Sequence, residues 1–429
     1  MDVNDKTVEK KEKEEPRDSI FGLFTSKRKN LIKNRNVLQN TFIPNQLPHR
    51  KREIDQIAEI IAPSLQKNKP SNILITGRTG TGKTAVLSYI ERELKKADPE
   101  EENCCYVYVN CEVVDAPTSI LYNISNQIIK EHEKKIPFTG WSFDKVYETL
   151  VSYIDEEDKV FIVVLDEIDM AFQKRGDEIF YFLTTMNEIL KKSKVSIVGI
   201  TNNTKFTELL STKIKSRLGE EKIIFTSYTP EQIKDILKER AETAFNPGIL
   251  DEGVIPYCAA ISAQDSGDAR RAIDLLRIAA DIAERNGDVK ITEAHVNYAR
   301  SRIELDAVSE VIKTMPIQSK IVLMGIIRNR DNGEGNKNRM TTGEVYSMYS
   351  EICGVLGHQV LTQRRITNII SELDMLGIIH AIVKSYGRNG RTKEIELNIT
   401  NDIVEMISRD DIFKPLLNYK PKKQTTLSL

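Results

Sequence analysis

The sequence predicts an α/β fold: a parallel sheet built around a phosphate-binding P-loop, then a helical lid, then a C-terminal winged helix. Three observations support this prediction. An apolar, strand-like segment at 71–76 leads into a glycine-rich loop and then a helical pattern. Two later apolar segments end in polar side chains, as buried parallel strands do where ligands bind at their carboxyl ends. The last third of the chain changes to helices followed by a β-hairpin pattern.

The composition is that of a soluble globular protein. The 429 residues are 40% hydrophobic and 29% charged, a length that predicts about two to four domains. We find no apolar run of about 18 residues and no apolar N-terminal segment, so neither a membrane span nor a secretory signal is expected. The five cysteines lack C-x-x-C and zinc spacing, which predicts reduced thiols in a cytoplasmic protein. Because the net charge is −1, nucleic-acid binding would need local basic patches.

The chain should begin with a charged tail at 1–38. The tail ends in a basic run that comprises Lys27, Arg28, Lys29, Lys33 and Arg35. The simpler interpretation is a solvated segment, and the alternative is a basic arm that helps to hold DNA phosphate. A nucleotide-binding base domain is placed after it, at 39–227.

The run GRTGTGKT at 77–84 matches the phosphate-binding motif G-x-x-x-x-G-K-[ST]. Its glycines let successive N–H groups point at one concave spot, and the following helix turns its positive end to the phosphates. We expect Lys83 to reach the β- and γ-phosphates and the Thr84 hydroxyl to bind Mg²⁺. The predicted nucleotide-binding residues here are Gly77, Gly80, Thr81, Gly82, Lys83, Thr84 and Ala85.

Two predicted strands end in side chains with a chemical use. Six consecutive apolar residues predict a central strand buried on both faces, and Asp166 and Glu167 follow it. We expect Asp166 to join Thr84 as the metal site, and Glu167 to orient and deprotonate an attacking water. The next strand ends at Asn202, whose amide can hold that water. The alternatives are a solvated strand end for the acids and a turn-forming asparagine.

Helical patterns dominate the segment 228–304, which we interpret as a lid. Asp268 can cap the last of its helices, and Arg270 and Arg271 lie in that helix's first turn. Basic side chains there oppose the helix dipole at a cost of about a few tenths of a kcal/mol, so they indicate an anionic partner. The alternative is that both are ordinary surface arginines.

A winged helix is predicted at 305–410, followed by a tail at 411–429. Helical patterns at 310–327, 342–354 and 361–373 precede two alternating segments around a glycine-rich turn. Basic side chains gather at the start of the third helix and along the hairpin, where DNA phosphate would lie. Winged helices also bind proteins, but this patterning favours DNA. The predicted DNA-binding residues are Arg364, Arg365, Lys384, Arg388, Arg391 and Lys393.

Taken together, these motifs carry a resemblance to a known family. The P-loop, Asp166-Glu167, Asn202, Arg217 and Gly-Asp-Ala-Arg270 occur in this order and precede a winged helix. The chain thereby resembles the AAA+ ATPases. It is most similar to the archaeal origin-recognition initiators, relatives of the eukaryotic origin recognition complex and of the cell-division-cycle replication protein. The resemblance spans roughly 42–398.

The resemblance implies roles for residues around the nucleotide. Asn202 corresponds to the position called sensor 1. Arg270 corresponds to sensor 2, which would touch the γ-phosphate from the lid. Tyr228 and Arg240 correspond to positions that line the nucleotide in these initiators.

It also implies contacts with neighbouring molecules. Arg217 corresponds to an arginine finger that acts on a neighbouring subunit's nucleotide. Lys213 is the competing candidate, because this segment departs from the more frequent Pro-Arg-Val-Lys. The insertion at about 115–130 lies where the family carries a DNA-contacting helix, although it holds few basic residues here.

The function implied is that of a replication initiator with slow, switch-like ATP hydrolysis. It would bind ATP or ADP with Mg²⁺, grip double-stranded origin DNA with the winged helix and the insertion, and help to recruit the replicative helicase of the MCM type. Other initiator paralogues are further implied partners, no membrane is involved, and the expected location is the cytoplasm, on the nucleoid. One alternative is a clamp-loader-like ATPase, but that family ends in a helical collar. The other is an ATP-switched winged-helix regulator of transcription or signalling.

Overall fold

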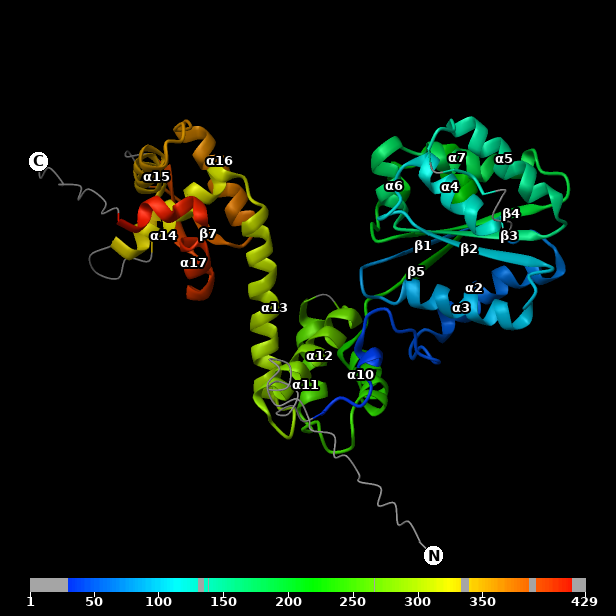
Figure 1. The fold of residues 1–429 in the computed structure, drawn as a ribbon, viewed down its shortest axis with the longest axis horizontal. Coiled ribbons are helices and arrows are strands. Elements are labelled where there is room, and N and C mark those ends of the chain that lie inside the picture. Colours follow the sequence, from blue (N-terminus) through cyan, green and yellow to red (C-terminus); the bar gives the residue numbers. More distant parts are fainter. Residues whose placement is uncertain are drawn as a thin grey trace, which may run out of the picture. The chain divides into compact units, whose positions relative to one another are not determined.

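The computed structural model describes residues 30–129, 135–137, 139–265, 267–332, 339–385 and 391–418. The chain divides into two compact units, the first ending at Ala299 and the second beginning at Arg300 (Figure 1). None of the helices in this described part combines the length and hydrophobicity that a membrane span requires.

The first unit contains a five-stranded parallel sheet with the strand order β2-β3-β4-β1-β5. The middle strands β3, β4 and β1 are buried almost throughout, which explains why their sequences are continuous apolar runs rather than alternating ones. The predicted α/β fold is therefore confirmed. The strands are β1 (Ile73–Gly77), β2 (Cys104–Asn110), β3 (Val160–Asp166), β4 (Lys194–Thr201) and β5 (Glu221–Phe225).

Helices cover both faces of this sheet and create two separate hydrophobic cores (Figure 1). On one face, α2 and α3 bury Ile57, Val86 and Leu87 against the strands. The other face is covered by the remaining base-domain helices. The bounds are α2 (Lys51–Ile61), α3 (Lys83–Ala97), α4 (Pro117–Ile128), α5 (Phe143–Glu156), α6 (Ile168–Arg175), α7 (Glu178–Thr185), α8 (Phe206–Leu209) and α9 (Thr212–Leu218).

The lid follows β5 and consists of α10 (Pro230–Ala244), α11 (Val254–Asp265) and α12 (Ala269–Asn286). The lid begins at a capping box, in which Thr229 and Gln232 satisfy each other's backbone N–H groups. The carboxylate of Asp268 accepts the first N–H groups of α12, so the predicted cap is present. These caps set where each helix starts, and so where Arg240 and Arg270 lie relative to the P-loop.

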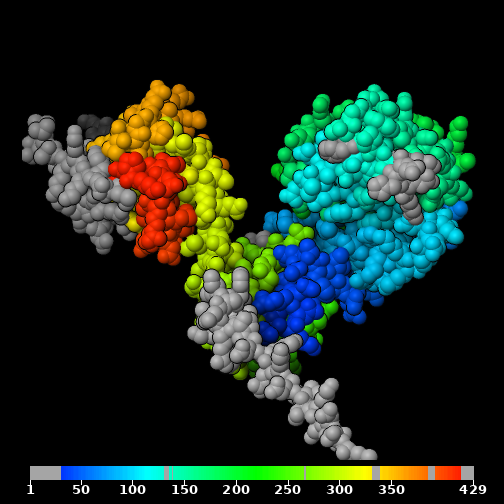
Figure 2. All heavy atoms as spheres, in the orientation of Figure 1, coloured from blue at the N-terminus to red at the C-terminus, as the bar shows by residue number. Residues whose placement is uncertain are grey.

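The segment 31–38, predicted as part of the charged tail, is packed on the lid (Figure 2). The N–H groups of Leu31 and Ile32 donate to Glu284 Oε1 at 2.9 and 3.0 Å. Arg35 forms ion pairs with Glu284 and a neighbouring aspartate of α12. The sequence pattern obscured this packing because the segment has only two apolar pairs, separated by four polar or charged residues.

The second unit is a winged helix, as predicted, with a three-stranded antiparallel sheet in the order β6-β8-β7. Its core continues beyond residue 410, where a tail was expected, because Phe413 and Leu416 are buried. The short strand β6 was not foreseen. The elements are α13 (Glu293–Thr314), which begins in the first unit, α14 (Ile317–Asn332), β6 (Arg339–Thr341), α15 (Thr342–Leu356), α16 (Gln363–Met375), β7 (Ile379–Ser385), β8 (Arg391–Leu397) and α17 (Asn401–Ser408).

Candidate functional site

The P-loop joins β1 to α3 at the carboxyl edge of the sheet. Gly80 and Gly82 have φ angles of 72° and 89°, a left-handed conformation that glycine adopts without strain. Gly80 has a second constraint, because a Cβ there would lie 1.7 Å from a carboxylate oxygen of Asp268. The loop can therefore fold tightly and also touch the lid, as the hydrogen bond from Ala269 N to Gly80 O at 3.2 Å shows.

Lys83 is buried inside the loop that it terminates. Its Nζ donates to the carbonyl oxygens of Gly77 and Arg78, both at 2.8 Å, and to Asn202 Oδ1 at 2.7 Å. Burial lowers the pKa of Lys83 to about 8. All three acceptors are neutral, so a phosphate group would compete for this cation with a charge that none of them has.

Asp166 lies beside the start of α3 and is held on both oxygens. Its Oδ2 accepts from Thr84 Oγ1 and from the Tyr108 hydroxyl, each at 2.8 Å, and its Oδ1 accepts from Glu167 N at 2.9 Å. A hydroxyl and a carboxylate are hard oxygen ligands, and Mg²⁺ is commonly bound by one or two carboxylates plus substrate phosphates. These residues therefore fit a magnesium ion. Tyr108 was not predicted for this site, and its signal in the sequence is its place on the strand next to β3.

Glu167 and Asn202 face each other across the ends of β3 and β4. Asn202 Nδ2 donates to Glu167 Oε1 at 3.3 Å, while its Oδ1 accepts from Lys83. Glu167 has a φ of 54°, a left-handed conformation that is uncommon for a non-glycine residue and concentrates at functional sites. Burial, and next the nearby Glu112 carboxylate, raise the pKa of Glu167, which favours a role in proton transfer.

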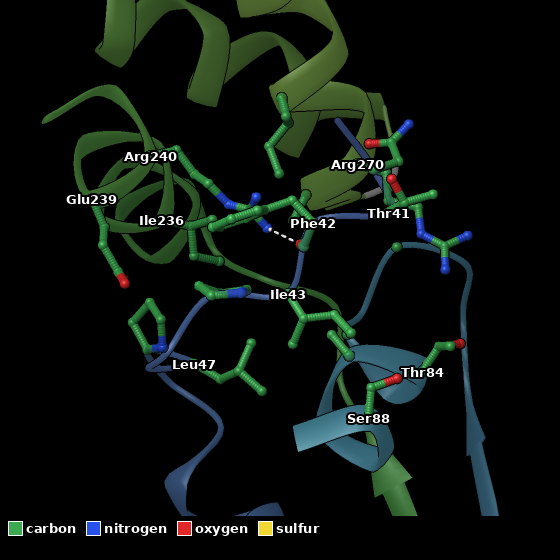
Figure 3. Close-up of a pocket in the computed structure, with 18 of the residues that line it drawn as sticks. Thr41, Phe42, Ile43, Leu47, Thr84, Ser88, Ile236, Glu239, Arg240 and Arg270 are labelled. Carbon is green, nitrogen blue, oxygen red and sulfur yellow. Dashed lines mark hydrogen bonds between the residues drawn. The ribbon is translucent and has the colours of Figure 1, made fainter. Parts of the chain in front are cut away.

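An apolar cavity of about 420 Å³ opens from the P-loop toward the lid (Figure 3). Phe42 and Ile43 come from the N-terminal segment, Ile236 from α10, and Thr84 and Ser88 from α3. A smaller hollow contains the charged residues described above, and the two share Gly80, Gly82, Thr84 and Arg270. An apolar chamber that leads into a charged cradle suits a ligand with an aromatic base and a phosphate chain.

Arg240 and Tyr228, the two residues expected to line the nucleotide, form hydrogen bonds with other groups of the protein. The Arg240 guanidinium donates to the carbonyl of Phe42 at 2.9 Å (Figure 3) and to that of Val37 at 2.6 Å. Tyr228 accepts a hydrogen bond from Arg50 at 3.0 Å. Both residues border the cavity. Their part in nucleotide binding stays a prediction, and their position in the cavity wall supports it.

The remaining predicted residues of the nucleotide site also lie in or beside the P-loop and the two hollows. The Thr81 side chain, however, forms a hydrogen bond within the loop. The Thr81 hydroxyl donates to Arg78 O at 2.8 Å. Gly77 is the last residue of β1, and Ala85 borders the apolar cavity. Arg270, exposed in the first turn of α12, borders both hollows.

Arg217 borders neither hollow. It lies on α9, where its guanidinium forms an ion pair with Glu188 at 2.7 Å. Lys213, the competing candidate, is exposed on the same helix. Both side chains are placed outside their own chain's site, an arrangement that an arginine finger acting on a neighbour requires. Which of them has that role stays a prediction.

The basic residues predicted to bind DNA on the winged helix differ in how free their side chains are to contact a phosphate. Arg364 and Arg365 are exposed in the first turn of α16. Lys384 pairs with Glu394 at 2.7 Å, and Lys393 Nζ donates to Ser371 Oγ at 2.6 Å. Lys27, Arg28, Lys29 and Arg388 lie outside the described residues, as does the side chain of Arg391. The first turn of α16 is therefore the strongest described candidate for a phosphate contact.

The insertion expected to contact DNA corresponds to α4. This helix contains neither Lys nor Arg, and it buries Ile120, Leu121 and Ile124 in the core. Its described side chains therefore give little support for a phosphate contact, and its DNA role stays a prediction.

Comparison with known proteins relates this architecture to one family. Residues 66–210 match an AAA domain, 234–301 match the Cdc6 AAA+ ATPase-type lid domain, and 310–406 match the CDC6 C-terminal winged helix domain. An ORC1-type DNA replication protein of Pyrococcus abyssi is 47% identical over 407 residues, 94% of this chain and 96% of that protein. An ORC1-type DNA replication protein 1 of Methanosarcina acetivorans is 46% identical over 406 residues, covering 94% and 97%.

Solved structures of related proteins have the same architecture. The Aeropyrum pernix ORC1 protein in complex with DNA is 42% identical, with a TM-score of 0.74 over 91% of this chain and 100% of that chain. Drosophila ORC bound to DNA shares the fold, with a TM-score of 0.57 and 20% identity over 95% and 96%. The expected resemblance is confirmed: the chain belongs to the ORC1/Cdc6 family of DNA replication proteins.

Proposed function

We propose that this chain is an ATP-switched initiator of DNA replication. It binds ATP or ADP with Mg²⁺ between its base and lid, binds double-stranded origin DNA with its winged helix, and helps to recruit the replicative helicase. The observation that supports this most is the position of Arg270. This lid residue borders the same charged hollow as Lys83 and Asn202 of the base, so a nucleotide's terminal phosphate would be contacted from both sides.

Six of the residues that line the hollow have distinct tasks in this proposal. Lys83 exchanges its carbonyl acceptors for the β- and γ-phosphates, and Asn202 holds the water that attacks. Glu167 accepts a proton from that water, for which its raised pKa suits it. Thr84 and Asp166 would hold Mg²⁺, which neutralises phosphate charge when bound. Arg270 contacts the γ-phosphate only while it is present, so the lid responds to hydrolysis.

DNA binding is proposed for the winged helix. The Aeropyrum pernix ORC1 structure, 42% identical to this chain, is a complex with DNA. Arg364 and Arg365 are exposed in the first turn of α16, where they can meet backbone phosphates. Contacts from the insertion would be polar or apolar, because α4 carries no Lys or Arg. From the resemblance to the family we also propose recruitment of the helicase, association with initiator paralogues, and a cytoplasmic location on the nucleoid.

Footprinting on the genome's own origin candidates tests this function. We expect protection of a few discrete sites with MgATP, an altered footprint with MgADP, and no nucleotide dependence for Lys83→Ala. Lys95→Ala is the matched control, because Lys95 lies exposed near the end of the same helix and pairs with Glu91 one turn earlier. Genome-wide occupancy confined to one or a few origins supports the initiator role. Scattered occupancy of promoters would contradict it.

A further inference from the structure

Arg50 is a buried guanidinium that joins three segments distant in sequence. It immediately precedes α2 and is only 3% exposed. Its Nε donates to Thr81 O at 2.9 Å and to the Tyr228 hydroxyl at 3.0 Å. Its Nη2 donates to Thr226 O at 2.6 Å, and its Nη1 pairs with Glu53 at 2.6 Å. The P-loop, the base-to-lid connection and the start of α2 thus meet at one side chain.

Two aromatic rings complete the surroundings of Arg50. Its guanidinium carbon lies 4.1 Å from the ring centre of Tyr228 and 5.2 Å from that of Phe225. The P-loop touches the same group, since a Cβ on Gly82 would lie 2.8 Å from the Tyr228 hydroxyl. A planar guanidinium can stack on rings and donate along its edge at once, whereas a lysine ammonium cannot.

The contact with Thr81 has a consequence for phosphate binding. In a trans peptide the C=O and the following N–H point in opposite directions. By holding the Thr81 carbonyl, Arg50 fixes the direction of the Gly82 N–H on the other side of the same peptide. That N–H belongs to the P-loop series that would cradle phosphate.

The contacts with Thr226 and Tyr228 have a consequence for the lid. Both residues lie between β5, which ends at Phe225, and α10, which begins at Pro230. This short connection carries the whole lid, including Arg270. One buried side chain therefore links the phosphate loop to the base of the lid.

We propose that Arg50 is a positioning residue that couples phosphate binding in the P-loop to the setting of the lid. It borders neither of the two hollows, and it acts through the Thr81–Gly82 peptide and the 226–229 connection. This inference rests on the nucleotide site proposed above. It predicts that the contribution of Arg270 to ATP binding depends on Arg50.

Calorimetric titration of the full chain with MgATP and MgADP tests the first half. Arg50→Lys keeps the positive charge beside Glu53. It loses the planar set of N–H donors and the stacking on the rings of Tyr228 and Phe225. We expect both dissociation constants to rise roughly tenfold or more, since hydrogen bonds to a charged group are worth about that factor. Arg52→Lys, at an exposed position in the first turn of α2, is the control and should bind like the wild type.

A double-mutant cycle tests the coupling itself. Arg270→Ala should weaken MgATP binding in the wild-type background and add little further loss in the Arg50→Lys background. Additive losses, or affinities within twofold of wild type for Arg50→Lys, would overturn the proposal. A wild-type chain that binds neither nucleotide would instead refute the nucleotide site.

A second variant keeps the test decisive if thermal unfolding shows that Arg50→Lys does not fold. Tyr228→Phe removes one acceptor of Arg50 and keeps the ring. We expect it to weaken nucleotide binding about threefold and to reduce the effect of Arg270→Ala. Unchanged affinity together with an unchanged Arg270→Ala effect overturns the proposal by this route.

Discussion

The Tyr108 hydroxyl donates a hydrogen bond of 2.8 Å to Asp166 Oδ2, the same oxygen that accepts from Thr84. Strand pairing brings the two residues together, because β2 and β3 run parallel with Asn110 opposite Asp166. Tyr108 therefore orients the carboxylate that we expect to hold Mg²⁺. Such supporting contacts around a metal ligand commonly affect metal affinity.

Replacing Tyr108 by phenylalanine should weaken the Mg²⁺ dependence of nucleotide binding. The lost hydrogen bond is worth about 0.5–1.5 kcal/mol, so we expect about a two- to twelvefold higher Mg²⁺ concentration at half-saturation. ADP binding in the presence of chelator should not change. Tyr106→Phe is the control, since Tyr106 lies on the same strand and donates to Leu87 O at 3.3 Å. An unaltered Mg²⁺ titration for Tyr108→Phe would exclude this role.

The first turn of α16 should supply salt-dependent DNA affinity. Each phosphate neutralised adds about 0.9 to the slope of log K against log salt. We expect Arg364→Ala with Arg365→Ala to lower that slope by about 2 and to weaken binding to all duplexes, measured by fluorescence anisotropy across a salt series. Arg409→Ala, at the C-terminal cap of α17 and paired with Glu405, is the matched control. A slope that stays the same would remove the start of α16 from the interface.

Lys393→Met should behave differently from those arginine variants. Lys393 is half-buried and donates to Ser371 on α16. Its loss should lower the free energy of unfolding by about 1 kcal/mol, and it should change the salt slope by less than one phosphate's share. Chemical denaturation and the same anisotropy series distinguish the two effects. A full one-phosphate loss of slope without loss of stability would show that Lys393 contacts DNA directly.

Mixing variants can determine whether Arg217 or Lys213 acts on a neighbouring chain. An arginine finger is worth about 10³-fold or more in turnover. If Arg217 is the finger, Arg217→Ala chains should lose ATP turnover and regain it when Lys83→Ala chains, which keep Arg217, are added. Chains carrying both Lys83→Ala and Arg217→Ala should give no rescue. The same pattern for Lys213 in place of Arg217 would transfer the role to Lys213.

The free energy of unfolding should decrease at acid pH, in part because Asp98 becomes protonated. Its carboxylate accepts from the N–H groups of Glu102, Asn103 and Cys104 at 3.0, 2.8 and 2.9 Å. Burial raises its pKa, but these backbone donors outweigh burial and leave the pKa below its usual value. The pKa of Asp98 is lower in the folded protein than in the unfolded chain, where it is about 4. Asp98 therefore contributes its full stabilisation above about pH 4, and this contribution is lost as the pH falls from there through the folded-state pKa.

Asp98→Asn measures this contribution. We expect a loss of about 1.5–3 kcal/mol in the free energy of unfolding at pH 7, with a smaller difference from wild type at acid pH. Denaturant unfolding across the pH range gives both numbers. Asp158→Asn, at an exposed aspartate, should follow the wild type. A difference that stays constant as the pH falls below 4 would contradict this origin of the stability.

The sequence by itself determined the fold class, the family and the main chemical groups of the nucleotide site. These features are local: GRTGTGKT is contiguous, and Asp166, Glu167 and Asn202 directly follow buried apolar runs. Parallel strands end at one edge of a sheet, so side chains that follow them must gather there. Spacing and hydrophobic pattern were therefore sufficient to predict which residues come together.

Tertiary structure alone decided what supports those groups. Arg50 and Tyr228 are 178 positions apart, and Leu31 and Glu284 are 253 apart, so no local pattern can reveal that they pair. The same holds for Lys393 and Ser371, where a lysine predicted for DNA is tied to the protein. A charged side chain looks alike in sequence whether it faces solvent or a buried partner. Only the packing of distant segments shows which groups are bound and which remain available to a ligand.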